Sequence, residues 1–81
     1  MIDFDKDWIS IRVSIESGQS LMTMLDDIRS FRKTGVLRDD STLRVIDREF
    51  TAQFSTDSNL RLVENAVLYE ISRRWYNEHE Y

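Results

Sequence analysis

The residue types that support catalysis or bind metal ions are scarce in this sequence. Cysteine is absent, which excludes disulfides, thiolate zinc sites and thiol nucleophiles. The single histidine, His79, lies close to the C-terminal end, where we expect a solvated side chain rather than a catalytic or metal-binding one. The two glycines, Gly18 and Gly35, stand apart, so we find no glycine-rich loop that could hold a phosphate.

Acidic residues form small groups, none of which has the spacing of a metal site. These groups are Asp3, Asp5 and Asp7, then Asp26 and Asp27, then Asp39 and Asp40. The first group resembles the opening of a calcium-binding loop, but Trp8 stands where the loop needs glycine and Ser14 where it needs glutamate. The adjacent pairs would hold Mg²⁺ only together with a bound phosphate. We therefore predict no catalytic residue, no metal site, no cofactor and no small-molecule substrate, and we expect the chain not to be an enzyme.

The residues best suited to recognition lie in the last third of the sequence. Leu62, Tyr69 and Tyr76 recur at intervals of seven, so on a helix they occupy one side, and Arg73 lies beside them. Tyrosine and arginine are enriched in binding hot spots because they combine a large contact area with polar groups. We predict that Leu62, Tyr69, Arg73 and Tyr76 bind another protein or a second copy of this chain.

The charge balance argues against nucleic acid as a partner. Eleven Lys and Arg residues against fifteen Asp and Glu residues give a formal net charge of −4, whereas nonspecific nucleic-acid binding relies on an excess of cations. Near the predicted recognition residues, Arg61, Arg73 and Arg74 are interleaved with glutamates that largely cancel their field.

The length of 81 residues predicts a single domain, residues 1–81, with one small core. Hydrophobic residues at 41% and charged residues at 32% are typical of a globular protein outside membranes. No stretch approaches the ~18 consecutive apolar residues that a membrane helix needs, and no signal-peptide pattern opens the sequence. We therefore expect a cytoplasmic protein.

The first element predicted to position these residues is a strand over residues 8–15. Polar residues there alternate with four β-branched ones, Ile9, Ile11, Val13 and Ile15. Such alternation is typical of a strand with one buried face.

An amphipathic helix is predicted over residues 20–33. Its apolar residues recur at helical spacing and are Leu21, Met24, Leu25, Ile28 and Phe31. Serines in the preceding turn can cap this helix, and Gly35 supplies a left-handed stop. Asp26 and Asp27 are expected to face water, where they could steer a basic partner.

Residues 36–54 fit two interpretations. The abundance of Thr, Val, Ile and Phe favours one strand with a bulge, or two strands, and we prefer this interpretation. As a helix, the segment would place Leu43, Ile46 and Phe50 on one face with Ser41 as the cap. Whether residues 43–54 form one strand, a hairpin or a helix stays open.

The last helix is predicted to begin near Thr56, Asp57 and Ser58 and to continue to the charged tail. Its core-facing residues are expected to be Leu60, Val63, Val67, Ile71 and Trp75. The expected fold class is therefore α+β, in the order strand, helix, strand or hairpin, helix, with two helices packed on one face of a small antiparallel sheet.

A short string in the last helix is similar to part of a known family. Glu64-Asn65-Ala66-Val67, followed by Glu70-Ile71-Ser72-Arg73-Arg74, resembles the C-terminal helix of a small phage inhibitor of type I-F CRISPR complexes. The resemblance covers about eleven of the 81 residues, and the different spacing of its two halves rotates one half by ~100° on a helix. It does not assign the chain to that family, but it implies that an anti-CRISPR type of inhibitor, which occludes a partner, is one form of the function.

The expected function is a non-enzymatic protein-binding module, an inhibitor or regulator of a larger assembly, that acts through the outer side of the last helix. Two alternatives stay open, a structural subunit that forms a homo-oligomer through the same residues and an antitoxin-like regulator associated with nucleic acid. The same side of the helix could instead be covered within the chain, by Phe4 and Trp8 or by residues 36–54.

Overall fold

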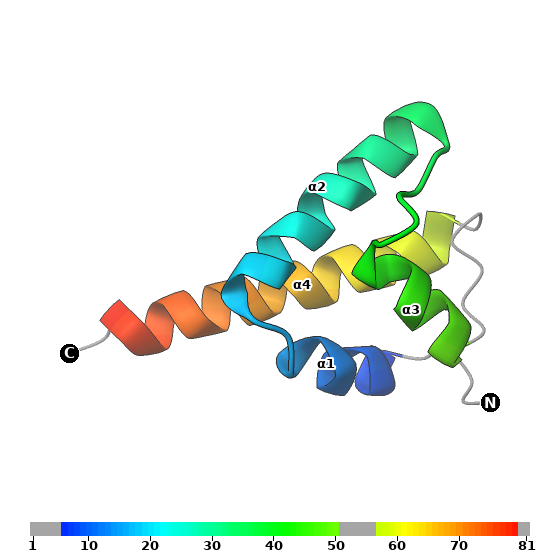
Figure 1. The fold of residues 1–81 in the computed structure, drawn as a ribbon. Coiled ribbons are helices and arrows are strands. Elements are labelled where there is room, and N and C mark those ends of the chain that lie inside the picture. The colour runs from blue at the N-terminus through cyan, green and yellow to red at the C-terminus, as the bar shows by residue number, and fades with distance from the viewer. Residues whose placement is uncertain (1–5, 51–56, 80–81) are drawn as a thin grey trace.

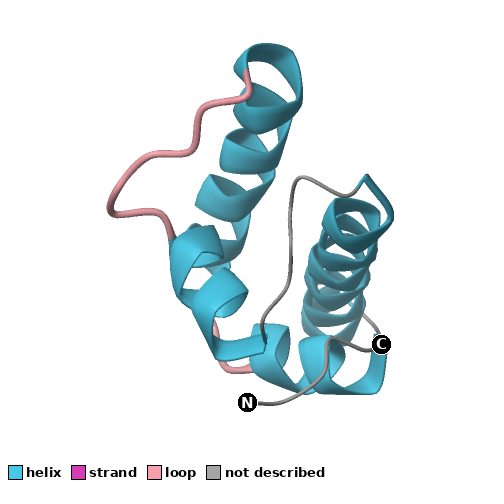
Figure 2. Ribbon diagram, turned by 90° about the vertical axis from the view of Figure 1, so that its right-hand side faces the viewer, coloured by secondary structure: helices cyan, strands magenta, loops and turns pink. Residues whose placement is uncertain are grey.

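The helices of the protein are defined by a computed structural model, which describes residues 6–50 and 57–79. Within these ranges the chain forms α1 (Lys6–Ser14), α2 (Gly18–Thr34), α3 (Thr42–Phe50) and α4 (Asp57–His79), and it contains no strand (Figure 1, Figure 2). The predicted α+β fold with an antiparallel sheet is therefore wrong, because the described part of the chain is all-helical. Among the described helices, none combines the length and the apolar character needed to cross a lipid bilayer.

Most of the segment predicted as the first strand belongs to α1. Of its alternating side chains, Ile9 and Val13 are buried, whereas Ile11 and Ile15 are exposed. Residues four apart share one side of a helix as well as one side of a strand, so the buried pair fits both structures. A helix satisfies its backbone hydrogen bonds internally, whereas a strand needs a neighbouring strand, which the described residues do not provide. The strand prediction is wrong for this reason.

The helix predicted over residues 20–33 is confirmed as α2. Ser17 caps its first turn, and the Ser17 Oγ accepts a hydrogen bond from the N–H of Ser20 at 3.1 Å. At the other end Gly35 has a φ of 74°, and its N–H donates to the carbonyl of Phe31 at 2.7 Å. Side chains other than glycine rarely adopt this left-handed conformation, so Gly35 is well suited to end the helix.

Residues 42–50 form α3, so the preferred strand interpretation is wrong here and the helical alternative is confirmed. Leu43 and Ile46 are fully buried, and α3 packs against α2. Ser41 is the expected cap, because its Oγ accepts a hydrogen bond from the N–H of Leu43 at 3.2 Å. Residues 51–54, to which the same prediction extended, lie outside the described residues.

The hydrophobic core lies where α1 and α2 pack against α4 (Figure 1). Its buried residues are Ile9, Val13, Leu21, Met24, Leu25, Ile28, Leu43, Ile46, Leu60, Val63, Ala66 and Val67. The predicted core-facing side of the last helix is confirmed at Leu60, Val63 and Val67, and Ile71 is partly buried against the same core. Trp75 is 60% exposed, so its predicted place in the core is wrong.

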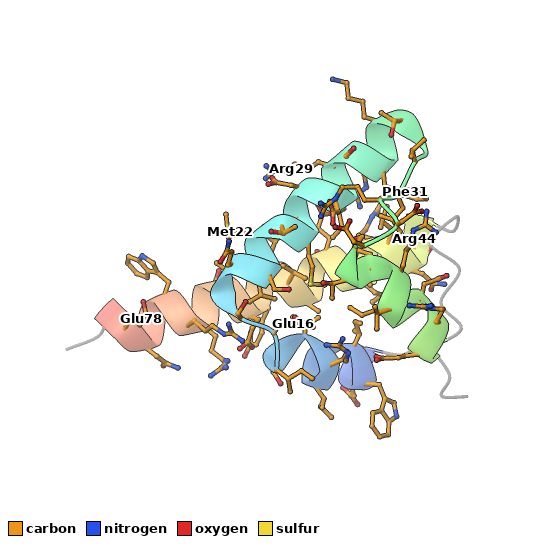
Figure 3. All side chains as sticks on the ribbon, in the orientation of Figure 1. Glu16, Met22, Arg29, Phe31, Arg44 and Glu78 are labelled. Atoms are coloured by element: carbon orange, nitrogen blue, oxygen red, sulfur yellow. The ribbon has the colours of Figure 1, made fainter. Side chains whose placement is uncertain are left out.

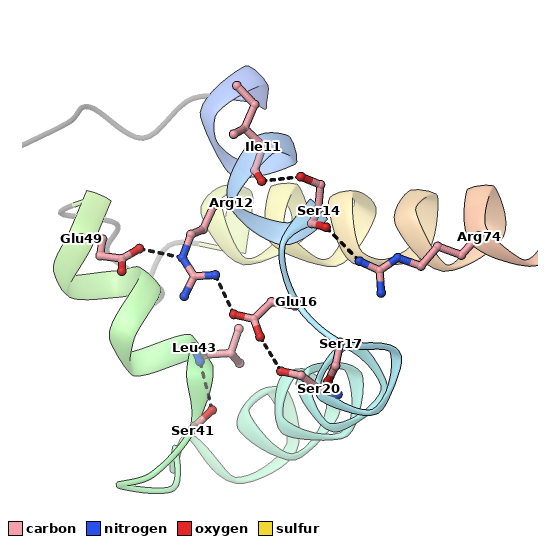
Figure 4. A network of polar contacts seen from close by, with 10 residues as sticks. All are labelled: Ile11, Arg12, Ser14, Glu16, Ser17, Ser20, Ser41, Leu43, Glu49 and Arg74. Carbon is pink, nitrogen blue, oxygen red and sulfur yellow. Dashed lines mark hydrogen bonds and ion pairs between the residues drawn. The ribbon is translucent and has the colours of Figure 1, made fainter.

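A polar network ties α1 to both α2 and α3 (Figure 4). The Arg12 guanidinium donates to Glu16 Oε1 at 2.6 Å and to Glu49 Oε2 at 2.8 Å. Glu16 Oε2 accepts a further hydrogen bond from the Ser20 hydroxyl at 2.8 Å. Burial alone raises the pKa of Glu16, but the hydrogen bonds from Arg12 and Ser20 outweigh burial and lower this pKa below its ordinary value. Charge-assisted hydrogen bonds thus help to hold three helices around the core.

Candidate protein-binding face

The acidic groups noted in the sequence do not assemble into a metal site among the described residues. Asp39 and Asp40 are exposed, and each lies 3.7 Å from the guanidinium group of a nearby arginine. Three other residues considered for metal binding lie outside the described part of the structure. They are Asp3, Asp5 and the side chain of His79. Asp39 and Asp40 therefore take part in ion pairs with nearby arginines.

Asp27 is buried, so the prediction that it faces water is wrong. Its carboxylate accepts two hydrogen bonds from Arg38, at 2.9 and 3.0 Å, and one from the Ser41 hydroxyl at 2.7 Å. Burial alone raises the pKa of Asp27, but the hydrogen bonds from Arg38 and Ser41 outweigh burial and lower this pKa. From its place on α2, Asp27 thus fixes the linker to α3 and the residue that caps α3.

A second buried carboxylate, Glu70, lies where α4 meets the end of α1. It accepts hydrogen bonds from Arg73 Nε at 3.1 Å and from Arg74 Nε at 2.9 Å. Arg74 also donates to the carbonyl of Ser14, the last residue of α1, at 2.9 Å (Figure 4). The hydrogen bond from Arg73 is the main reason that the pKa of Glu70 is lowered, although burial opposes it. Arg73, a predicted contact residue, therefore already has an ion-pair partner within the chain.

The side of α4 turned away from the core carries more exposed large apolar side chains than any other described helix. We define the outer face as Asn65, Leu68, Tyr69, Ser72, Trp75 and Tyr76, all of which are exposed. The exposed fractions of its four large side chains are 44% for Leu68, 68% for Tyr69, 60% for Trp75 and 58% for Tyr76. Figure 1 shows that the last turns of α4 extend past α1 and α2.

The outer face is arranged symmetrically around Ser72. Leu68 and Tyr69 precede this residue by four and three positions, and Trp75 and Tyr76 follow it by three and four. At ~100° per residue, positions three and four residues away on a helix lie within ~60° of the central direction. All four large side chains therefore point to the same side as Ser72.

A groove between α1 and α4 adjoins the outer face. Its volume is about 640 Å³, and it is lined by Ile9, Ser10, Leu62, Asn65, Ala66 and Tyr69. Leu62 is half-buried in this groove, whereas Tyr69 belongs to both the groove and the outer face. An incoming side chain could therefore contact both at once.

The predicted contact residues lie in one region of α4, but their surroundings differ. Tyr69 and Tyr76 lie on the outer face, Leu62 lines the groove, and Arg73 is 47% exposed beside its partner Glu70. Whether these residues contact a partner stays a prediction.

The sequence left open the alternative that other segments of the chain cover this side of α4. Trp8 is itself 46% exposed, and α3 packs on α2. The other proposed covers, Phe4 and residues 51–54, lie outside the described residues. Within the described part of the chain, the large side chains of the outer face thus remain largely exposed.

Two large side chains of the outer face, Leu68 and Trp75, were not among the contact residues predicted from the sequence. A spacing of seven residues selects a single line of side chains along a helix, so it does not include Leu68. Trp75 also continues the spacing of the apolar residues on the core side of α4. The signal that identifies them is the placement of large apolar residues three and four positions on both sides of Ser72.

Comparison of the chain with protein-family models, with curated proteins and with solved structures found no match. Its function is therefore inferred from the side chains of α4 and their surroundings.

Proposed function

We propose that this chain is a non-enzymatic protein-binding module that binds its partner through the outer face of α4 and the adjoining groove. The observation that carries the proposal is the exposure of Leu68, Tyr69, Trp75 and Tyr76 on one side of a single helix. Contiguous exposed apolar surface of this kind is typical of interaction sites, because covering it releases water from apolar groups. An inhibitor or regulator of a larger assembly is the form of this function that the sequence favours.

The rigidity of α4 supports the proposal. Its inner side is held in the core by Leu60, Val63 and Val67. Glu64 near its beginning accepts a hydrogen bond from Arg32 of α2 at 2.7 Å, and Arg74 binds the end of α1. A helix held in this way loses little conformational entropy when its outer side is covered, so more of the gain from burial is kept as affinity.

The charges near the outer face favour a protein over a nucleic acid as the partner. Arg73 and Arg74 both donate to Glu70, so the single carboxylate of Glu70 balances part of their positive charge within the chain. Binding to a phosphate backbone relies on several cations that neutralise phosphates, whereas tryptophan and tyrosine side chains are typical anchors of protein interfaces.

A capture experiment with matched variants tests this function. The unchanged chain, a Tyr69→Ala/Tyr76→Ala variant and a Met22→Ala/Val36→Ala control are each immobilised and incubated with a cell lysate and, separately, with the soluble chain. Met22, near the start of α2 (Figure 3), and Val36 are about as exposed as the tyrosines but lie outside α4. Circular dichroism verifies that all three remain helical.

We expect the unchanged chain and the control to retain a protein that the tyrosine variant binds more weakly, by roughly 1–3 kcal/mol for each tyrosine. Equal retention by all three proteins would contradict the proposal. Loss of helicity in the tyrosine variant alone would also contradict it, because the outer face would then be required for folding.

A further inference from the structure

We infer that the partner of the outer face is a second copy of this chain, so that two α4 helices cross as an antiparallel pair at Ser72. This inference rests on the proposed function, because it names the partner of the same face. It is carried by the order of residues along the face, by their charge and by the area that they expose.

The symmetric order of the outer face suits such a pair. A two-fold axis beside Ser72 relates two antiparallel helices so that positions before Ser72 in one copy lie opposite positions after it in the other. Leu68 and Tyr69 of one copy then meet Trp75 and Tyr76 of the other, and the same contact repeats on the other side of the axis. Every large apolar side chain of the face thereby meets large apolar side chains of the second copy.

The central residue fits a helix crossing. Ser72 is small and exposed, so it does not hold the two backbones apart where they cross. Packed helices lie about 8–10 Å apart, depending on the side chains at the contact, and larger residues on either side interlock. A small residue flanked by large ones at three and four positions provides this arrangement.

The charges of the face also suit a second copy, which necessarily brings the same charges. None of the six residues of the outer face is charged at neutral pH, so pairing two faces brings no like charges together. Arg61, at the N-terminal end of the face, then lies toward the C-terminal end of the other α4. The C-terminal end of a helix is the negative end of its dipole, so it attracts this arginine.

The exposed area reaches the size of a weak specific interface. Because an aromatic side chain can bury roughly 150–250 Å², the exposed fractions of Tyr69, Trp75 and Tyr76 correspond to roughly 370 Å² in one copy and about 740 Å² in a pair, to which Leu68 adds. Asn65, Ser72 and the flanking residues bring the total near the ~1,000 Å² expected of a biological interface. We therefore expect a dimer that dissociates on dilution.

The first experiment measures the absolute mass in solution by sedimentation equilibrium across a hundredfold range of concentration. We expect the mass to rise from 9.7 kDa toward twice that value as the concentration increases. Ser72→Glu places two like charges beside the two-fold axis and should raise the dissociation constant at least about a hundredfold. The matched control is Ser30→Glu, which introduces the same charge at an exposed position of α2 and should leave the mass unchanged.

The decisive experiment mixes Ser72→Glu with Ser72→Lys. Each variant alone places like charges at the axis and should be monomeric, whereas the mixture places opposite charges there and should form a one-to-one dimer. Only a pair in which position 72 of one copy lies close to position 72 of the other predicts this rescue. Should Ser72→Glu lose its helicity, Tyr76→Glu takes its place and is mixed with Leu68→Lys, because these positions face each other across the pair.

The outcomes separate this inference from the proposed function. A concentration-dependent dimer that Ser72→Glu disrupts and the mixture restores supports the inference. A monomer at every concentration overturns it, as does a dimer that Ser72→Glu leaves intact or a mixture that fails to pair. If the chain is a monomer but the tyrosine variant still loses a protein captured from the lysate, the proposed function stands and only the second copy is excluded.

Discussion

The inner and outer sides of α4 are both apolar, yet the fold covers only one of them. Leu60, Val63 and Val67 on the inner side are buried against α1 and α2, whereas Leu68 and Trp75 on the outer side are largely exposed. The spacing of both sets is helical, so the period of hydrophobic residues identifies the helix without identifying the side that enters the core. Burial is decided by the elements that pack against the helix.

A similar contrast separates two adjacent carboxylates of α2. Asp26 is exposed, whereas Asp27 is buried and accepts three hydrogen bonds from Arg38 and Ser41. Neighbouring residues on a helix point ~100° apart, so one of them faces the linker to α3 while the other faces water. In both contrasts, identical or similar residue types have different roles because of what lies opposite them.

The largest difference in stability is expected between alanine variants of two leucines of α4, one on each side of the helix. Leu60→Ala removes a buried side chain and should lower the free energy of unfolding by about 2–5 kcal/mol, because the lost contacts leave a cavity. Leu68→Ala makes the same change on the outer face and should cost less than about 1 kcal/mol in the monomer. Urea unfolding of dilute samples measures both. Equal losses would show that the outer side of α4 is as tightly packed as the inner side.

The two carboxylates of α2 provide the next comparison. Asp27→Asn removes the charge that Arg38 and Ser41 bind, and it should lower the free energy of unfolding by about 1–3 kcal/mol. Asp26→Asn is the matched control and should change it by less than about 0.5 kcal/mol. The measurement is again urea unfolding at neutral pH, and a larger effect at Asp26 would contradict the described burial of Asp27.

Acid should reduce stability through the carboxylates that bind arginines. The pKa values of Asp27, Glu16 and Glu70 are lowered in the folded chain from their ordinary values of 3.8, 4.5 and 4.5. As the pH falls, the unfolded chain therefore takes up these protons first, so this stabilisation is full above the ordinary values and is lost as the pH falls through the lowered ones.

The pH dependence is measured from urea unfolding at neutral pH and at about pH 3. The Asp27→Asn variant should lose less stability between the two pH values than the unchanged chain, because one of the responsible groups is gone. An equally large loss in both proteins would show that Asp27 does not contribute to the acid sensitivity.

The smallest effect is expected from the ion pair between Arg32 and Glu64, which joins the surfaces of α2 and α4 at 2.7 Å. Both side chains are partly exposed, so a double-mutant cycle with alanine at each position should give a coupling of about 0.2–1 kcal/mol. The coupling should weaken as salt is added, because partly exposed charges are screened. A coupling that is insensitive to salt would indicate that the pair is more deeply buried than the structure shows.

The sequence was sufficient where helical spacing and end signals agreed. α2 was predicted with its serine cap and with Gly35 as its stop, and most of the inner side of α4 was predicted as well. These elements are long, so the helical spacing of their apolar residues is clear.

The sequence misled where a segment was short and its period ambiguous. In residues 8–15, Ile9 and Val13 fit a strand and a helix equally, and the exposed Ile11 and Ile15 resembled further core residues. In α3, β-branched and aromatic residues outweighed the cap at Ser41, although packing against α2 determined the outcome. The absence of a partner strand in the described residues could not be foreseen from either segment by itself.

The candidate site could be predicted only in part from the sequence. Tyr69 and Tyr76 were identified from their residue type, whereas Trp75 was assigned to the core because its position continues the period of Val67 and Ile71. The sequence did not reveal that the last turns of α4 extend past α1 and α2 (Figure 1), where the period of the core side no longer implies burial.

The buried carboxylate of Asp27 also has a consequence for how the molecule opens. Asp27 binds Ser41, the Ser41 hydroxyl accepts the N–H of Leu43, and Arg44 donates to the carbonyl of Arg38 in the same linker. These bonds tie the linker and the start of α3 to the middle of α2, so we expect these segments to open as one cooperative unit. In native-state hydrogen exchange, the amides of this unit should become accessible through a shared opening, while the far end of α4 exchanges by local fraying.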